Sequence, residues 1–485
     1  MQGIVDFLNG IIWSNALIYL CLGTGVFFSV IMKFPQVRLI KDMIQQMLNG
    51  EASENGVSSF QGFAMALGGR VGTGNIAGVA TAIGSGGPGA IFWMWAIAFL
   101  GAGSAYIESA LAQVYKEEID GEYRGGPSYY IEKGLGIKWY AVLFAICAVF
   151  GVGVFLPGVQ ANSITSAVNT AFGISPAITG GVVVALLAFI IFGGTKRIGK
   201  AAELIVPFMA IAYIIITLII IFMNITMLPD IFMLIIRSAF GADAVFGGIL
   251  GTAIMWGVKR GIYSNEAGQG TGPMAAAAAE VSHPAKQGLV QTFSVYVDTL
   301  FVCSATAFMI LITGTYNVAN PAGGYIVENL PGVETGPAFT QMAVSSLLPG
   351  FGEAFVAIAL FFFAFTTLLA YYYYAETNVA YLFKGSKNHK TYFLITKLAL
   401  LAMTFFGAVR TADLAWALGD IGVGAMAWLN IIAILLLTKT GVGTLKDYEK
   451  QKKEGKDPIY EPEALGIKNA DVWKVIAARY KKKIS

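Results

Sequence analysis

The chain has 485 residues, of which 56% are hydrophobic and only 13% charged, and its formal net charge is +3. These values are far from those of soluble domains and predict an integral membrane protein with no nucleic-acid partner. Long uncharged runs without strict alternation favour membrane-spanning helices over the strands of an outer-membrane barrel. Cys21, Cys147 and Cys303 lie far apart, which excludes a disulfide framework or a thiolate metal site.

Taken in chain order, the apolar runs predict eleven membrane-spanning helices. They lie near residues 11–33, 60–83, 91–115, 139–170, 177–194, 201–223, 244–276, 287–315, 350–383, 391–409 and 414–437. We expect the first run to be a retained span, because it lacks the basic region and the cleavage site of a signal peptide. Residues 224–243 are too short for a span between their polar ends and are expected in the outer interface.

The connections between these spans alternate in basic content. Those after the first, fifth and ninth spans contain Lys33, Arg38 and Lys41, then Lys196, Arg197 and Lys200, then Lys384, Lys387 and Lys390. By contrast, residues 316–350 contain no Lys or Arg. The positive-inside rule therefore predicts a multi-pass protein of the plasma membrane with its N-terminus outside and its C-terminus in the cytoplasm. The basic tail, residues 438–485, is expected to be a polar helical extension whose charges signal topology or contact anionic lipid headgroups.

Two spans are interrupted by glycine and polar residues: "GGRVGTGN" begins at Gly68 and "GVKRGIYSNEAGQGTGP" begins at Gly257. Glycine costs about 1 kcal/mol in a helix, and freed backbone groups cost more in hydrocarbon, so such breaks are expected to face a cavity. The alternative is that the glycines only permit close helix packing. A nucleotide-binding loop is excluded, because the glycine spacing is wrong, no strand precedes it and no GK[ST] follows.

The interruptions occupy matching positions in two five-helix halves, residues 60–223 and 244–437. This pattern is typical of secondary transporters, and a unit of five helices must be inverted in its second copy. Residues 1–59 then form an extra N-terminal helix with its cytoplasmic connection, and residues 224–243 form a connector. At each break the bare carbonyls of one half-helix suit a cation or an ammonium group, whereas the bare N–H groups of the next suit a carboxylate. The sequence therefore favours a zwitterionic amino acid as substrate.

The stretch "GGRVGTGNIAGVATAIGSG", followed by "GGPGAIFWMW" and later by "YSNEAGQGT", resembles the alanine or glycine:cation symporter family of the amino acid/polyamine/organocation superfamily. The resemblance covers nearly the whole chain. It implies an all-α carrier of alanine, often also of glycine, with sodium as the co-transported ion and no organic cofactor. It also implies the five-plus-five inverted repeat of the neurotransmitter:sodium symporters.

Through this resemblance, the first break matches a G-x-G-N motif, and the substrate-carboxylate role falls on Thr73, Gly74 and Asn75. The sodium ligands implied are the main-chain carbonyls of Gly68 and Val71 together with two hydroxyls. Neutral oxygens suit a hard cation.

The two hydroxyls are those of Thr366 and Thr367 in "FAFTTLLA". Their alternative role is hydrogen bonding to a carbonyl of their own helix. Arg70 stands where these relatives have a small residue, which puts a second sodium site in question.

At the second break, Gly261, Tyr263, Ser264, Asn265 and Glu266 are expected to line the substrate pocket. Two roles are open for the Glu266 carboxylate. It caps the half-helix that follows, or it receives the substrate ammonium group.

Charged residues inside the spans need partners, since insertion scales assign about 2.5–3.5 kcal/mol to such a charge. Arg70 is expected to pair with Glu266 or Asp298 as a gate or a structural lock, or to contact the substrate carboxylate. Glu108 belongs to the same set of charges. The tyrosines at 371–374 are expected in interfacial packing.

The function predicted is sodium-driven import of alanine, and of glycine, by alternating access in a monomer surrounded by lipid. A proton-coupled carrier of the same fold remains an alternative, with Glu108, Glu266 or Asp298 as the titrating group. An intramembrane enzyme is disfavoured, because no nucleophile and base are spaced for catalysis and neither His283 nor His389 lies in a metal-binding pattern.

Overall fold

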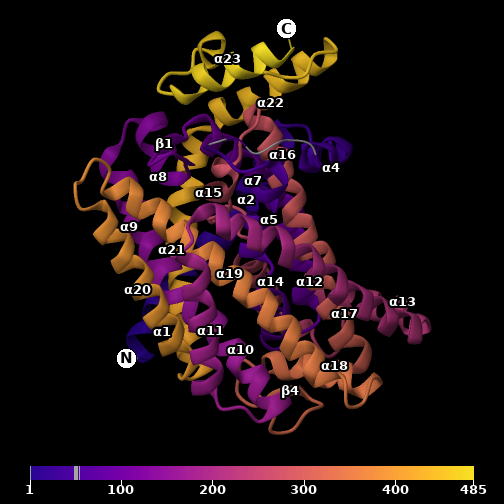
Figure 1. Ribbon diagram of the computed structural model, residues 1–485. Coiled ribbons are helices and arrows are strands. Elements are labelled where there is room, and N and C mark those ends of the chain that lie inside the picture. The colour runs from indigo at the N-terminus through magenta and orange to yellow at the C-terminus, as the bar shows by residue number, and fades with distance from the viewer. Residues whose placement is uncertain (1, 49–52, 54, 485) are drawn as a thin grey trace.

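The computed structural model describes residues 2–48, 53 and 55–484. Residues 49–52 and 54, in the first predicted connection, lie outside this range. The described chain is a bundle of helices with two small hairpins, one near each end of the bundle (Figure 1). Within the described residues, eight helical segments are long and apolar enough to cross a membrane.

All eleven predicted spans coincide with helices. Three of them are not among the eight long apolar segments. Two are the interrupted spans, and the third, predicted at 177–194, is a helix of only 16 residues. The predicted all-α membrane fold is therefore confirmed.

The chain begins with a helix that bends between two segments and then runs along one end of the bundle. These elements are α1 (Gln2–Ile12), α2 (Asn15–Ile31), α3 (Pro35–Arg38) and α4 (Ile40–Leu48). The bend is anchored by Trp13, whose indole Nε1 donates to the main-chain oxygen of Asp420 at 2.8 Å. The extra N-terminal helix is thus bound to the last predicted span.

The first half contains the first broken helix, then a long helix, a hairpin and three further helical spans. Its elements are α5 (Ser59–Arg70), α6 (Val79–Gly86), α7 (Gly89–Val114), β1 (Glu117–Ile119), β2 (Glu122–Arg124), α8 (Pro127–Tyr130), α9 (Lys138–Phe150), α10 (Leu156–Phe172), α11 (Pro176–Ile191) and α12 (Thr195–Met223). The strands are antiparallel. A capping box starts α5, since the Ser58 hydroxyl and the Gln61 side chain each bond the other residue's N–H.

After the connector helix α13 (Leu228–Ala239), the second half repeats this order. Its elements are α14 (Leu250–Asn265), α15 (Gly272–Ala278), α16 (Pro284–Val295), α17 (Ser304–Thr313), β3 (Asn317–Ala319), β4 (Tyr325–Glu328), α18 (Pro337–Leu347), α19 (Gly352–Leu382), α20 (His389–Ala408) and α21 (Ala412–Leu436). Each half has a broken helix, a hairpin after the next span and a short helix after that hairpin. In Figure 1, β1 and α8 lie at one end of the bundle and β4 and α18 at the other, so the second half is inverted.

The two breaks are enclosed by the rest of the bundle. Every residue in 62–80 and in 257–285 is buried. Large apolar side chains on α11 and α12 point outward instead, with Phe189 69% and Leu204 77% exposed. These outer faces suit contact with lipid.

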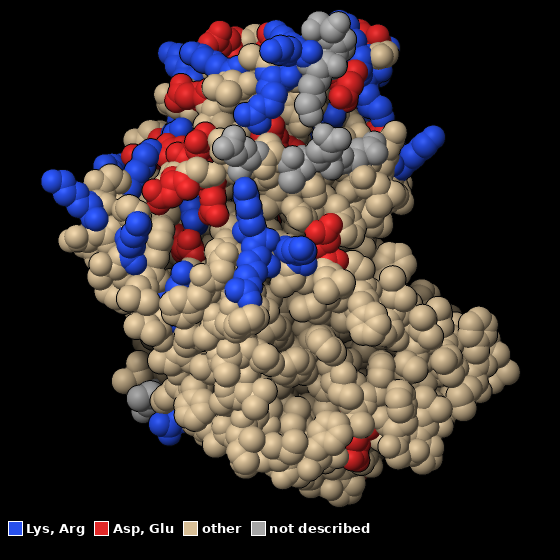
Figure 2. All heavy atoms as spheres, in the orientation of Figure 1, with Lys and Arg blue, Asp and Glu red and all other residues tan. Residues whose placement is uncertain are grey.

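Charged side chains gather over the end of the molecule that carries the tail, above a nearly uncharged band (Figure 2). Contacts join the three basic connections to this end. Arg38 pairs with Glu449 of the tail at 2.5 Å. Lys384 pairs with Glu117, and the Thr195 hydroxyl donates to Glu122 at 2.8 Å.

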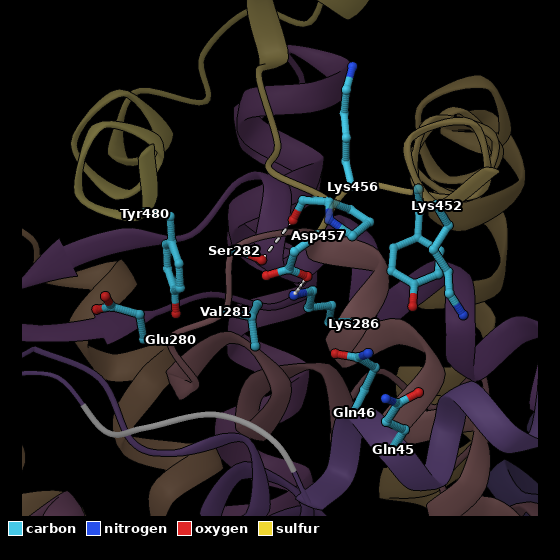
Figure 3. Close-up of a pocket in the computed structure, with 12 residues that line it drawn as sticks. Gln45, Gln46, Glu280, Val281, Ser282, Lys286, Lys452, Lys456, Asp457 and Tyr480 are labelled. Atoms are coloured by element: carbon cyan, nitrogen blue, oxygen red, sulfur yellow. Dashed lines mark hydrogen bonds and ion pairs between the residues drawn. The ribbon is translucent and has the colours of Figure 1, made fainter. Parts of the chain in front are cut away.

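The tail folds back onto the bundle instead of lying free. It comprises α22 (Thr438–Lys453) and α23 (Val472–Ile484). The buried Trp473 donates its indole N–H to the Gln113 carbonyl at 2.9 Å, and Arg479 pairs with Glu280 at 2.5 Å. The segment between the helices crosses the link from α15 to α16, where Asp457 pairs with Lys286 at 2.6 Å beside a cavity of about 350 Å³ (Figure 3).

Candidate functional site

The first break follows Arg70, the last residue of α5. Val71 leaves the helical conformation at φ −76° and ψ 88°, and a π-helical turn, Gly74–Gly78, leads into α6. The N–H of Gly72 donates to the side-chain oxygen of Asn75 at 2.8 Å. The asparagine side chain thus replaces a backbone acceptor, which is how a broken helix survives inside a membrane protein.

The second break follows Asn265, the last residue of α14, and lasts until α15 begins at Gly272. Glu266 has a positive φ of 56°, which is rare for a residue with a side chain. Glu108 of α7 accepts the N–H of Gly268 at 3.2 Å. The Asn430 amide of α21 donates to the Gly268 carbonyl at 3.0 Å and to Glu108 at 2.7 Å, so two distant side chains satisfy this unwound turn.

The two breaks lie against each other. A Cβ added at Gly74 would stand 3.1 Å from the Cα of Ser264. Asp298, in the π-helical segment Tyr296–Cys303, joins the two sides, because its Oδ1 accepts from the Asn75 amide at 2.7 Å and from the Ser264 hydroxyl at 3.1 Å. Polar groups from both halves of the chain therefore meet in the interior of the bundle.

Most residues predicted to bind substrate are brought together at this meeting point. Thr73, Gly74, Asn75, Ser264 and Asn265 lie on the two facing breaks. The Thr73 hydroxyl has no hydrogen-bond partner among the described residues. The amide oxygen of Gln160, from α10, accepts the N–H of Thr73 at 3.0 Å. Sequence reasoning missed Gln160, although it is a polar interruption in an apolar span.

Two rings form a wall beside the first break. Tyr263 and Trp416 have ring centroids 5.0 Å apart, and no described residue meets the Tyr263 hydroxyl in hydrogen-bond geometry. A Cβ added at Gly78 would lie 3.7 Å from the Trp416 ring. Trp416 was also missed, since its place on α21 is distant in sequence from both breaks.

Gly261 is placed differently from the expectation. An added Cβ there would meet the backbone of Met94 at 3.5 Å and the side chain of Ile97, both on α7. The residue lies inside α14, one turn before its end. It therefore allows close packing of α14 on α7, and its position does not support a role in the substrate pocket.

Of the four predicted sodium ligands, three have their oxygens close together and the fourth does not. The Thr367 hydroxyl lies 2.8 Å from the carbonyl oxygen of Gly68 and 3.5 Å from that of Val71. Thr366 and Thr367 both lie within hydrogen-bond distance of the Phe363 carbonyl of their own helix, at 2.9 and 3.1 Å, but it is Thr367 that also reaches the first break. Three oxygens from two helices thus converge at the end of α5, where backbone carbonyls are bare.

Arg70 does not make the expected ion pair with Glu266 or Asp298. Its Nε donates to the Asn265 carbonyl at 2.7 Å and its Nη1 to the side chain of Gln291 at 3.0 Å and to Ser294. These acceptors are neutral and come from α14 and α16. The guanidinium therefore ties the end of α5 to the second break through neutral acceptors, a structural role like the expected lock but without the expected charge pairing.

The tyrosines at 371–374 are buried and do not lie at an interface, which corrects the expectation for them. Tyr374 stands beside the first break, since a Cβ added at Gly69 would lie 2.6 Å from its hydroxyl oxygen. In the sequence, an aromatic run that packs inside the bundle looks the same as one that lies at the membrane interface. Only the packing of α19 against α5 shows which applies.

A second cavity, of about 760 Å³, lies at the end of α14 that is far from the tail. Arg260 and Lys259 both pair there with Asp420 of α21, at 2.8 and 2.7 Å. The Arg260 guanidinium is 4.4 Å from the centroid of Trp416. Since Tyr263 is on the next turn of α14, this cavity leads toward the two breaks.

The inverted halves and their paired breaks define the chain as a secondary transporter with the fold of the sodium-coupled symporters. A solved structure of a Na⁺-coupled sialic acid symporter shares this fold with a TM-score of 0.52 at 12% identity, and the match covers 98% of each chain. The sequence model of the sodium:alanine symporter family matches residues 1–462, and the chain belongs to this family. It is therefore a multi-pass membrane transporter and not an enzyme.

Two relatives illustrate how close the similarity is. The protein YrbD of Bacillus subtilis (strain 168) is 65% identical over 473 residues, which is 98% of each chain. The sodium/proton-dependent alanine carrier protein of Bacillus sp. (strain PS3) is 55% identical over 442 residues, covering 91% of this chain and 99% of that one.

Proposed function

We propose that this protein imports alanine together with sodium, and that both bind where its two broken helices meet. The family assignment and the name of the Bacillus sp. relative support alanine and sodium. The observation that carries the proposal is the contact of the breaks through Asn75, Ser264 and Asp298. Unwound backbone is tolerated in a membrane where it serves a cavity or a ligand.

The substrate carboxylate is assigned to the first break. The Gln160 oxygen already accepts the N–H of Thr73 at 3.0 Å, so an acceptor oxygen fits there. The unpartnered hydroxyls of Thr73 and Tyr263 are available to a bound amino acid. In the proposed complex, a carboxylate oxygen takes the place of the Gln160 oxygen beside Thr73.

The proposed substrate is small because of what stands next to these groups. The rings of Tyr263 and Trp416 close one side. Opposite Trp416, a Cβ added at Gly78 would already lie 3.7 Å from the ring. Alanine fits such a space, and glycine is proposed as a second substrate. A larger side chain would have to displace one of the two rings.

The sodium ion is assigned to the carbonyls of Gly68 and Val71 and the hydroxyl of Thr367. Oxygen ligands without net charge suit a hard monovalent cation that must bind and leave in each cycle. Thr366 is left out of this set, because its hydroxyl lies against the Phe363 carbonyl and the Met209 sulfur, whereas that of Thr367 also reaches the carbonyls of Gly68 and Val71. In this proposal one half-helix end holds the cation, while the N–H groups after the break hold the carboxylate.

The adjacent threonines provide a matched test of this assignment. Radiolabelled alanine uptake into proteoliposomes is measured as a function of sodium concentration for Thr367→Val and Thr366→Val. Thr367→Val is expected to raise the sodium concentration for half-maximal uptake by about ten-fold or more, equivalent to about 1.4 kcal/mol. Thr366→Val is expected to stay near the wild type. Equal sodium dependence in all three proteins would remove the assignment.

Transport is proposed to occur by alternating access in a monomer surrounded by lipid, with the tail in the cytoplasm. The basic connections that contact the tail end support this orientation under the positive-inside rule. A cysteine placed at Gly443, in α22, should react with a membrane-impermeant thiol reagent only after cells are opened. Labelling in intact cells would show that the tail lies outside the cell, contrary to the proposed orientation.

A proton-coupled carrier is the second candidate, because the name of the Bacillus sp. relative includes the proton. Alanine uptake that persists without sodium and collapses when the proton gradient is removed would favour it. Uptake that requires sodium at every pH would exclude it as the sole mode of coupling.

A further inference from the structure

The Glu266 carboxylate is bare inside the protein. Among the described residues, no donor meets either of its oxygens in hydrogen-bond geometry, and the residue is only 1% exposed. Its backbone is held, since its N–H donates to the Ile262 carbonyl at 2.9 Å. Buried charged groups are normally paired and hydrogen-bonded, so this carboxylate requires an explanation.

The two other carboxylates near the breaks are treated differently. Glu108 accepts hydrogen bonds on both oxygens, and so does Asp298, whose donors are Asn75, Ser264 and Thr299. An ionised carboxylate only accepts hydrogen bonds, and several donors stabilise that form. These hydrogen bonds favour the ionised forms of Glu108 and Asp298, and Glu266 lacks such a set of donors.

The local charges do not balance either. Arg70 is the positive group that acts on Glu108, Glu266 and Asp298 alike. With all three carboxylates ionised, one positive charge would face three negative charges, so full ionisation would leave two negative charges without a counter-charge in the middle of the bundle. Such an excess is expensive in a low-dielectric interior and calls for added positive charge.

Hydroxyl oxygens lie near Glu266. The Thr271 hydroxyl is on the second break, within reach of the Glu266 carboxylate. The Tyr374 hydroxyl, which has no hydrogen-bond partner among the described residues, comes from α19 and interacts with the charges of Glu266 and Arg70. A carboxylate with neighbouring hydroxyl oxygens is a suitable set of ligands for a hard monovalent cation.

We propose that Glu266 forms a second cation site of this carrier, distinct from the one at Thr367, which takes up a sodium ion or a proton in each transport cycle. The two sites are separate because Thr367 faces the carbonyls of the first break, whereas Glu266 belongs to the second. The proposal rests on the cation-coupled function proposed above. It makes the second break part of the coupling mechanism.

Both cations share one chemistry, since each neutralises the carboxylate. A proton would attach to a Glu266 oxygen on binding and return to water on release. The charged and titratable groups that face Glu266 from neighbouring elements are Arg70 on α5, Glu108 on α7, Tyr263 on α14, Asp298, and Tyr371 and Tyr374 on α19.

The test compares full-length wild type with Glu266→Gln in proteoliposomes that hold a known membrane potential. Radioactive alanine and sodium fluxes give the sodium ratio, and the reversal potential gives the net charge moved per alanine. Glu266→Gln is expected to move about one elementary charge less per alanine. With sodium at the site, the sodium ratio also falls by about one; with a proton, it stays constant and uptake loses its pH dependence.

An unchanged charge per alanine together with an unchanged pH profile would overturn the proposal. If Glu266→Gln binds alanine without transporting it, equilibrium binding of radioactive sodium and proton release on adding sodium replace the flux measurement. Equal values in both proteins would then overturn it. If the wild type itself moves no alanine with sodium, the proposed function is refuted. That outcome differs from a sodium-driven wild type whose charge per alanine is the same as that of Glu266→Gln, which refutes the second cation site alone.

Glu108→Gln is the matched control for stability. Its new amide group would face a donor, either the Gly268 N–H or the Asn430 amide. We expect it to lower the unfolding temperature in detergent without sodium, whereas Glu266→Gln leaves that temperature unchanged or raises it. A lower unfolding temperature for Glu266→Gln would mean that its carboxylate has a structural partner, contrary to the proposal.

Discussion

Gly74 lies where the two breaks touch, and its missing side chain is what allows the contact. A Cβ at this position would stand 3.1 Å from the Cα and 3.2 Å from the Cβ of Ser264. That is tighter than ordinary contact, and rotation of the Ser264 side chain cannot move its Cα and Cβ away. The geometry of the proposed substrate site therefore depends on the absence of a side chain at Gly74.

Gly74→Ala is expected to reduce alanine uptake by about ten-fold or more, because overpacking of about 1–3 kcal/mol would push the breaks apart. Gly181→Ala, inside α11 and away from both breaks, is the matched control. Its added Cβ would meet nothing within 4 Å. Equal uptake by both variants would show that the contact at Gly74 is not needed for transport.

At the scale of elements, the second break is held open by α7 and α21. Asn430 of α21 donates to Glu108 and to the Gly268 carbonyl, and its own oxygen accepts from the Tyr130 hydroxyl. An unwound segment with fixed partners is a preorganised site, whereas one without them would collapse into helix. The two partner helices are therefore part of the break.

Asn430→Leu conserves volume but leaves Glu108 and the Gly268 carbonyl without a donor. Each buried acceptor that loses its partner costs about 1–3 kcal/mol, and more when it is charged. The variant is expected to unfold at a clearly lower temperature in detergent, as followed by tryptophan fluorescence. Asn169→Leu, which alters an exposed amide on α10, should be neutral. Equal unfolding temperatures would show that water replaces the lost donor.

The position of the spans and of both breaks follows from local sequence. Runs of about 20 apolar residues require helices, and the glycines at 68–74 and at 268–272 weaken the helix where it ends. The hairpin and short helix repeated in each half were not predicted, because three-residue strands have too little periodicity. They are nevertheless the features that make the inversion visible.

The partners of the site could not be predicted in the same way. Gln160 and Asn430 bond to residues 87 and 162 positions away. Nothing in the local pattern distinguishes such an amide from one that is satisfied by its own helix. Thr366 and Thr367 illustrate this limit, since both hydroxyls approach the Phe363 carbonyl of their own helix and it is Thr367 that also reaches Gly68.

At the scale of the whole molecule, the tail crosses the link between α15 and α16. His283, the N-cap of α16, accepts the Ala285 N–H on Nδ1 at 3.1 Å, so its Nε2 carries the proton that Asp447 of α22 accepts at 3.1 Å. The docked tail therefore selects neutral His283. Burial lowers the pKa of His283 below its usual value, although Asp447 opposes this.

Because the docked state binds fewer protons than the free state, docking is fully stable above the usual histidine pKa and weakens as the pH falls toward the lowered one. Limited proteolysis of the tail should therefore accelerate several-fold between about pH 7.5 and about pH 5. His283→Gln should remove most of this change. A tail that is equally protected at both pH values, or equally pH-dependent in the variant, would contradict the assignment.

The docked position of Trp473 also has a consequence for biosynthesis. Residues 472–484 follow every membrane span in the chain, yet they bind Gln113 at the end of α7 and Glu280 beside α15. The ribosome must therefore synthesise both halves of the chain before these contacts can form. Until then, the end of the bundle to which the tail binds lacks these contacts.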